Sequence, residues 1–285
     1  MPQLLSASEK DLGEFSVRRM LPNTARSMVG PFIFFDHMGP ANFPAGKGVN
    51  VRPHPHIGIA TITYLFTGSI LHRDNLGFLQ EIRPGDINWM TAGSGIVHSE
   101  RETPEVRNVD HPLHGLQLWI ALPDDKEEIE AAFHHHPKDT LPVFDYEGAS
   151  IRLMAGEIYG QQSPVQTYSP MYYADVQLPD ATTIALPAAG QETAIYVIKG
   201  QVSIGDTRYA PFDFVYVSPD ETLSVTANGE AQIVLIGGKP FDTPRYIEWN
   251  FVSSSKERIE QAKADWREGR FPKVPGDDEF IPLPD

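Results

Sequence analysis

The sequence predicts a mostly antiparallel β-protein built from two related barrel-like halves. Short stretches rich in β-branched and aromatic residues alternate with turns, and 25 prolines and 23 glycines are scattered along the 285 residues. A similar order of strands and turns occurs in each half of the chain. Together these observations favour an all-β fold with few helices.

The internal repeat is visible when the two halves are compared. The first half reads TYLFTGSIL and then RPGDINWMTAG, and the second reads IYVIKGQVSI and then YAPFDFVYVSP. Each copy contains a strand, a glycine turn, a second strand, a Pro-x-Asp turn and an aromatic strand. We therefore expect two domains, residues 1–140 and residues 141–285.

Two segments have helical signals. Residues 124–136 (DDKEEIEAAFHHH) open with acidic side chains, which favour a helix N-terminus. Residues 253–269 begin with serines that can cap a helix and end at a glycine. We expect the first helix at the junction of the halves and the second near the C-terminus.

Composition restricts the classes of function. The formal charge of −15 disfavours direct binding to nucleic acid, which needs a basic surface. The absence of cysteine excludes disulfides and thiolate metal sites. The longest apolar runs are only strand-length, which excludes a membrane span, and the start lacks the pattern of a signal peptide. We therefore expect a cytosolic protein.

The strongest chemical signal is a pair of short motifs in the first half, about 42 residues apart. His54 and His56 stand in HPH, and His98 and Glu100 stand in HSE. Residues i and i+2 of a strand share one face, so each pair can point to one side. Antiparallel pairing would bring three imidazoles and one carboxylate together, a set that suits Fe(II), Mn, Ni, Cu or Zn.

If the strand that carries HPH continued unbroken, its large side chains would line a cavity below the metal. Ile62, Tyr64 and Phe66 have the same parity as the two histidines. We therefore expect these three residues to form a substrate pocket.

The second half lacks a matching ligand set. All ten histidines lie between His37 and His136. At the positions of the repeat that correspond to His54 and His56, the second half has Leu186 and Ala188. The sequence thus predicts one metal per chain, held by the first barrel.

Through these and further motifs, the whole chain resembles the pirin family, whose members have two cupin barrels. The matching segments are FFDHMGP, RPHPHIGIATITYLFTG, PGDINWMTAGSGIVHSE and HGLQLWIALP. The resemblance implies two tandem cupin barrels, with His54, His56, His98 and Glu100 as ligands and iron as the usual metal. It also implies a second barrel without metal.

This chain departs from the wider cupin pattern, which has a glutamate ligand three or four residues after its HxH. Ala60 and Thr61 occupy those positions here. Glu100 is thus expected to be the one acidic ligand.

The resemblance implies two alternative functions. Several pirins cleave quercetin with O₂, and Glu100 would then accept the proton of the flavonol hydroxyl. Other pirins act as metal-dependent regulators through protein contacts, to transcription-factor complexes or metabolic enzymes. In that case the acidic surface would meet a basic partner.

Most of the remaining histidines and two tryptophans are expected to have structural roles. His37 could reach the mouth of the site, and His72 has no assigned role. The others follow: His111, His114 and His134–His136 in turns, in hydrogen bonds or on the surface, and Trp89 and Trp119 in the core.

Overall fold

The computed structural model describes residues 2–13, 15–187 and 190–284, which divide into two compact units. The first barrel comprises the described residues of 9–19, 34–138 and 242–285. The second barrel comprises those of 1–8, 20–33 and 139–241. Each end of the chain therefore belongs to the barrel formed mainly by the opposite half of the sequence. Each barrel is therefore formed by three separate stretches of the sequence.

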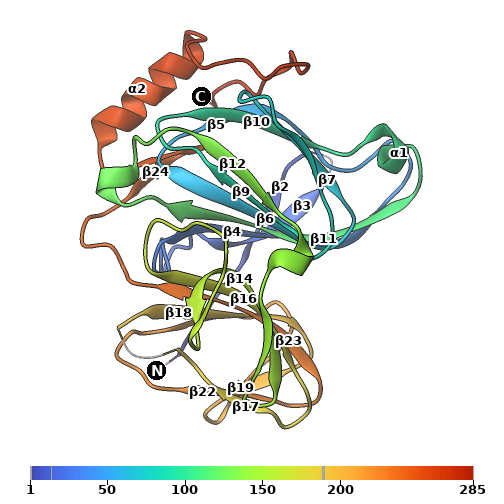
Figure 1. The fold of residues 1–285 in the computed structure, drawn as a ribbon, viewed down its shortest axis with the longest axis vertical. Coiled ribbons are helices and arrows are strands. Elements are labelled where there is room, and N and C mark those ends of the chain that lie inside the picture. Colours follow the sequence, from blue (N-terminus) through green and yellow to red (C-terminus); the bar gives the residue numbers. More distant parts are fainter. Residues whose placement is uncertain (1, 14, 188–189, 285) are drawn as a thin grey trace. The chain divides into compact units, whose positions relative to one another are not determined.

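The first barrel is built mainly from two antiparallel sheets (Figure 1). The strand order of the larger sheet is β12-β9-β6-β11-β4-β3-β2, and that of the smaller sheet is β5-β10-β7-β8. The larger sheet contains β2 (Ser8–Asp11), β3 (Ser16–Leu21), β4 (Phe32–Phe43), β6 (Ile59–Thr67), β9 (Ile87–Thr91), β11 (His111–Ala121) and β12 (Ala132–His136). The smaller sheet contains β5 (Asn50–His56), β7 (Ile70–Asp74), β8 (Leu79–Ile82) and β10 (Ile96–Arg101).

The second barrel repeats this plan. Its larger sheet has the order β1-β21-β18-β23-β16-β14-β13, with β15 beside β14, and its smaller sheet has the order β17-β22-β19-β20. The strands are β1 (Gln3–Leu5), β13 (Val143–Tyr146), β14 (Ala149–Ile158), β15 (Gln161–Gln162), β16 (Met171–Leu178), β17 (Thr183–Ala185), β18 (Glu192–Lys199), β19 (Val202–Ile204), β20 (Thr207–Tyr209), β21 (Phe214–Val217), β22 (Ser224–Ala227) and β23 (Ala231–Gly238).

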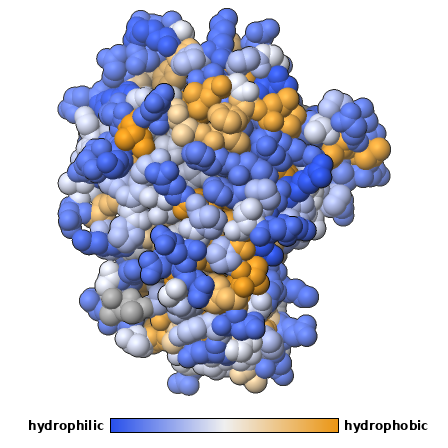
Figure 2. Space-filling view, viewed as in Figure 1, coloured by the Kyte–Doolittle hydropathy of each residue, from blue (hydrophilic) through white to orange (hydrophobic). Residues whose placement is uncertain are grey.

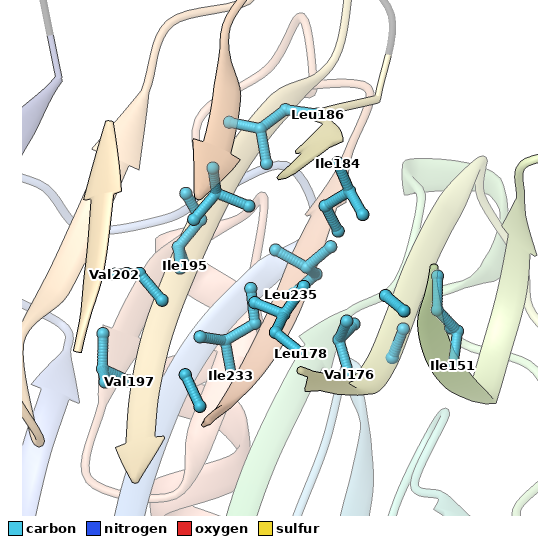
Figure 3. Packing of buried hydrophobic residues seen from close by; sticks show 14 of the residues in the cluster. Ile151, Val176, Leu178, Ile184, Leu186, Ile195, Val197, Val202, Ile233 and Leu235 are labelled. Carbon is cyan, nitrogen blue, oxygen red and sulfur yellow. The ribbon is translucent and has the colours of Figure 1, made fainter. Parts of the chain in front are cut away.

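Aliphatic side chains fill the second barrel. Figure 3 shows Ile195, Val197, Ile233 and Leu235 packed with residues of neighbouring strands. Leu186, which stands where the first half has His54, belongs to this core and is 6% exposed. Ala188, at the position that corresponds to His56, lies outside the described residues.

One of the two expected helices forms. Helix α2 (Lys256–Arg267) is capped by Ser255, whose hydroxyl accepts a hydrogen bond from the Arg258 amide at 3.2 Å. Its apolar side chains pack in a cluster with Phe251 of β25 (Phe251–Ser253), which pairs with β24 (Tyr246–Glu248).

The helix expected over residues 124–136 is wrong. Residues Asp124–Lys126 form a single 3₁₀ turn, and the end of the segment is strand β12, paired with β9. Pairing along an open sheet edge outweighs the weak helical preference of this segment. A short helix that the sequence did not indicate, α1, spans Pro104–Arg107.

The surface is mostly hydrophilic on the face shown in Figure 2, with separate hydrophobic patches. The large apolar side chains that are exposed include Leu76, Phe78 and Leu79, around the β7–β8 turn. Within the described ranges, neither α1 nor α2 has the length and apolar character needed to cross a membrane.

Candidate metal centre

Three histidines meet inside the first barrel. His54 and His56 lie at the end of β5, and the neighbouring strand β10 places His98 directly opposite His54. The ring centroids are 4.4 Å apart for His54 and His98, 5.0 Å for His54 and His56, and 5.1 Å for His56 and His98. One ring nitrogen from each residue lies within 4.8 Å of the other two, and this is the one such group among the described residues.

The second ring nitrogen of each histidine is already engaged. Nδ1 of His54 lies 2.9 Å from the Arg52 carbonyl oxygen, and Nδ1 of His56 lies 3.1 Å from that of Asn250. A carbonyl only accepts, so both Nδ1 atoms donate and both Nε2 atoms keep a lone pair.

His98 also has a ring nitrogen that is available to a metal. Nε2 of His98 is buried and has no hydrogen-bond partner within the described part of the chain. A buried polar atom without a partner is costly, and a metal ion would satisfy it. The three residues could therefore hold a divalent metal of the type that prefers imidazole.

Burial keeps these imidazoles in the neutral form that binds metal. Burial lowers the pKa of His54 to about 4, despite the hydrogen bond from its ring to Arg52. Burial also holds the pKa values of His56 and His98 well below the ordinary value, and their neighbouring imidazoles add to the effect. Protons therefore compete little for the ring nitrogens near neutral pH.

Glu100 lies on the same strand as His98, but in a different environment. The pairing of β10 with β5 shifts register between the two residues, as at a β-bulge, which can redirect a side chain. Its Oε1 lies 3.4 Å from the hydroxyl of Thr63, and that hydroxyl lies 2.8 Å from Oε1 of Gln117. Burial raises the pKa of Glu100 to about 7, although the Thr63 hydroxyl opposes the shift.

The histidines and Glu100 line one cavity of about 370 Å³. Glu100 is outside the group of three close nitrogens, so its role as a fourth ligand stays a prediction. The other walls are largely aromatic and aliphatic, with a few polar groups: Leu12, Phe15, Val17, Arg19, Phe34, Asp36, Met38, Val49, Val51, Ile70, Gln117, Trp119, Trp249, Asn250 and Ile281.

Two stacked rings form part of this wall. Phe34 and Trp119 have centroids 4.0 Å apart and planes only 10° apart, and Trp119 is 4.9 Å from the His56 ring. On Phe34 lies the guanidinium of Arg19, which also binds Asp36 through two hydrogen bonds of 2.8 and 2.7 Å. Both tryptophans expected in the core are buried, Trp89 at 1% and Trp119 at 7% exposed, and Trp119 also lines the cavity.

The expected pocket residues Ile62, Tyr64 and Phe66 are not in the described lining of this cavity. The strand does not continue unbroken after His56. At Gly58, with φ of +69°, the chain leaves the smaller sheet and enters β6 of the larger sheet. The change of sheet reverses the alternation, so Thr63 lies on the side of Glu100 and its even-numbered neighbours face away.

Most other histidines make local hydrogen bonds outside the cavity lining. Nε2 of His37 and Nε2 of His114 are 2.8 Å apart, and His111 binds Glu102 at 2.9 Å. His135 binds Asn88 at 2.7 Å. His72 is the exception, because it contacts His98 directly, with 3.4 Å between their Nδ1 atoms.

Two antiparallel barrels, one of them holding three clustered histidines, define this chain as a two-barrel cupin protein. Two family models match it, Pirin over residues 14–120 and the Pirin C-terminal cupin domain over residues 173–272. The chain belongs to the pirin family. The prediction from its HPH and HSE motifs is thereby confirmed at the level of family and fold.

Known relatives cover almost the whole length. A Pirin-like protein of Caulobacter vibrioides is 49% identical over 287 residues, 99% of each chain. Human Pirin is 30% identical over 262 residues, 89% of this chain and 87% of its own. The crystal structure of quercetin 2,3-dioxygenase from Acinetobacter baumannii has a TM-score of 0.90 and 31% identity, covering 100% of this chain and 95% of that one.

Proposed function

We propose that this protein is a metal-dependent dioxygenase that cleaves quercetin or a related flavonol with O₂. The observation that carries the proposal is one cavity lined both by three closely grouped imidazoles and by the carboxylate of Glu100. The similarity to the Acinetobacter baumannii enzyme over the whole chain supports this choice of reaction.

His54, His56 and His98 would hold the metal, with Fe(II) the first expectation and Mn, Ni, Cu or Zn as alternatives. When bound, the metal would supply a Lewis acid and a template for the oxygen of the flavonol. Because the three nitrogens come from two adjacent strands of one sheet, the protein holds their geometry before the metal arrives.

Glu100 would accept the proton of the flavonol 3-hydroxyl. A general base works best when its pKa is near the working pH, and burial gives Glu100 such a value. The hydroxyl of Thr63 lies 3.4 Å from the Glu100 carboxylate and 2.8 Å from Oε1 of Gln117, so two acceptors share its one hydrogen. The ring of Trp119, which stacks on Phe34, adds apolar aromatic surface to the cavity beside the histidines.

The test is a set of assays on protein reconstituted with each of the five metals. Quercetin loss is followed by absorbance under air and under nitrogen, with metal content measured on the same samples. His135→Ala serves as a control, because this histidine lies on β12, outside the cavity. Turnover that needs both metal and O₂ supports the proposal. A metal-loaded protein that leaves quercetin unchanged under air contradicts it, and the regulatory alternative then takes its place.

A further inference from the structure

The three clustered histidines differ in what holds their second nitrogen. Nδ1 of His54 and Nδ1 of His56 each contact a backbone carbonyl. Nδ1 of His98 instead contacts a side chain, which in turn binds a second side chain. Strand β7 supplies both, His72 and Asp74, and it pairs with β10 so that Asp74 lies opposite His98. His72 and Asp74 are 4% and 0% exposed.

The direction of the hydrogen bonds can be worked out from Asp74. Its Oδ1 accepts the amides of Leu76 and Phe78 at 2.9 and 3.1 Å, and its Oδ2 lies 2.7 Å from Nε2 of His72. A carboxylate that accepts on both oxygens makes Nε2 of His72 the donor. With its hydrogen on Nε2, the ring of His72 offers the lone pair of Nδ1 to its other neighbour.

That lone pair decides the tautomer of His98. Nδ1 of His72 faces Nδ1 of His98 at 3.4 Å, so the proton between them belongs to His98. His98 therefore carries hydrogen at Nδ1 and a lone pair at Nε2, the buried atom that has no partner in the described residues. Phe133 stacks on His72 at 4.1 Å with planes 11° apart and holds the ring in this orientation.

We propose that His72 and Asp74 are positioning residues, which hold His98 in the tautomer that presents Nε2 to the metal. The inference rests on the metal site of the proposed function, but not on the reaction that follows. Carboxylate–histidine chains behind a ligand typically contribute a factor of about 10–100 to metal affinity.

Asp74→Asn is the sharpest test, because an asparagine can donate where aspartate only accepts. Its amide group would turn Nε2 of His72 into an acceptor and reverse each hydrogen bond of the chain. His98 would then carry its proton at Nε2. Long-range ¹H–¹⁵N correlation spectra of the metal-free protein report the tautomer directly, and titration with Zn(II) reports the affinity.

A matched control is Glu102→Gln, which alters the other buried histidine–carboxylate pair of this barrel, Glu102 with His111. We expect Asp74→Asn to move the proton of His98 to Nε2 and to weaken Zn(II) binding about 10–100-fold. Glu102→Gln should change neither result, even if it costs similar stability. His72→Phe provides a second variant, since it keeps a ring against Phe133 and removes the acceptor for His98.

An unchanged His98 tautomer in Asp74→Asn, or Zn(II) affinity within twofold of the native value, would overturn the inference. Should Asp74→Asn fail to fold, native affinity in His72→Phe would do the same. The tautomer is read without metal, so the hydrogen-bond chain can hold even where quercetin turnover is absent. A failed oxygenase assay and a failed positioning role are therefore distinguishable.

Discussion

Phe34 and Trp119 stack with centroids 4.0 Å apart, on a wall of the same cavity that contains the three histidines. We expect Trp119→Leu to keep the metal and to raise KM for quercetin by about two- to tenfold, because one stacking surface is worth roughly 0.5–1.5 kcal/mol beyond its area. Steady-state kinetics at equal metal content give the measurement. Trp89→Leu, a buried change outside the cavity, should lower stability without this effect on KM.

Metal content is the second prediction. We expect about one transition metal per chain, and His98→Ala should remove it and still leave a folded protein, because apolar burial in the two barrels supplies most of the stability. Elemental analysis and thermal unfolding followed by circular dichroism check both parts. Two metals per chain would contradict the single-site reading, and an unfolded His98→Ala chain would show that the ion is structural.

A third prediction concerns acid stability and His37. Burial, then the neighbouring His114 and Arg18, lower the pKa of His37 to about 3, against an ordinary value of about 6.5. Between these values the unfolded chain binds one more proton than the folded chain. The free energy of unfolding therefore falls as pH falls, by at most about 1.4 kcal/mol per pH unit for this group.

His37→Gln should make that decline shallower, whatever its effect on stability at pH 8. Urea unfolding at several pH values between 4 and 8 measures the slope. The control is His135→Gln, at a partly exposed position on β12. An equal slope in native protein and His37→Gln would show that His37 is not responsible.

The C-terminal segment supports a fourth prediction. Arg101 follows Glu100 on β10 and binds Asp277 at 2.9 and 3.0 Å, and the Ile281 amide donates to the Pro53 carbonyl at 2.8 Å. We expect Arg101→Ala to loosen this segment and to speed hydrogen exchange at the Ile281 amide about tenfold. Exchange mass spectrometry reports it, and Arg83→Ala, which removes an exposed pair with Glu81, is the control. Unchanged protection would mean that other contacts hold the segment.

Some of this site could be predicted from local spacing, and some could not. The i, i+2 pairs at His54 and His98 need only strand geometry, so the meeting of the three histidines was foreseeable. The prediction that Ile62 lines the cavity requires a continuous strand across Gly58, but the chain changes sheet there. Asn250 and Ile281 line the cavity although both lie more than 150 residues beyond His98 in the sequence, and no local pattern indicates such a contact.

A residue whose role depends on a neighbouring side chain is also hard to predict from the sequence. The sequence alone shows His72 only as a single histidine on a strand. Its role depends on the hydrogen bond to Asp74 and on the register of β7 against β10. The pattern HRD, with histidine and aspartate at i and i+2, is the one available signal, and it does not show which side chain His72 meets. The helix expected at 124–136 failed for a related reason, since β9 offers that segment an edge to pair with.

The last prediction separates an enzyme from a binding module through Glu100. Glu100→Gln keeps the size of the side chain and an oxygen that can accept from Thr63, so the cavity should stay intact. A neutral amide cannot take the flavonol proton, and turnover should fall by about 10²–10⁴-fold, the usual effect of losing a general base. Rates are compared per bound metal, under air and under nitrogen, because a weaker metal site alone would also lower the observed rate. A regulatory protein would instead show no O₂-dependent quercetin loss in the native form, and a glutamine variant whose defect follows metal content alone. Native turnover per metal in Glu100→Gln would rule out proton transfer to this carboxylate and assign the step to another group.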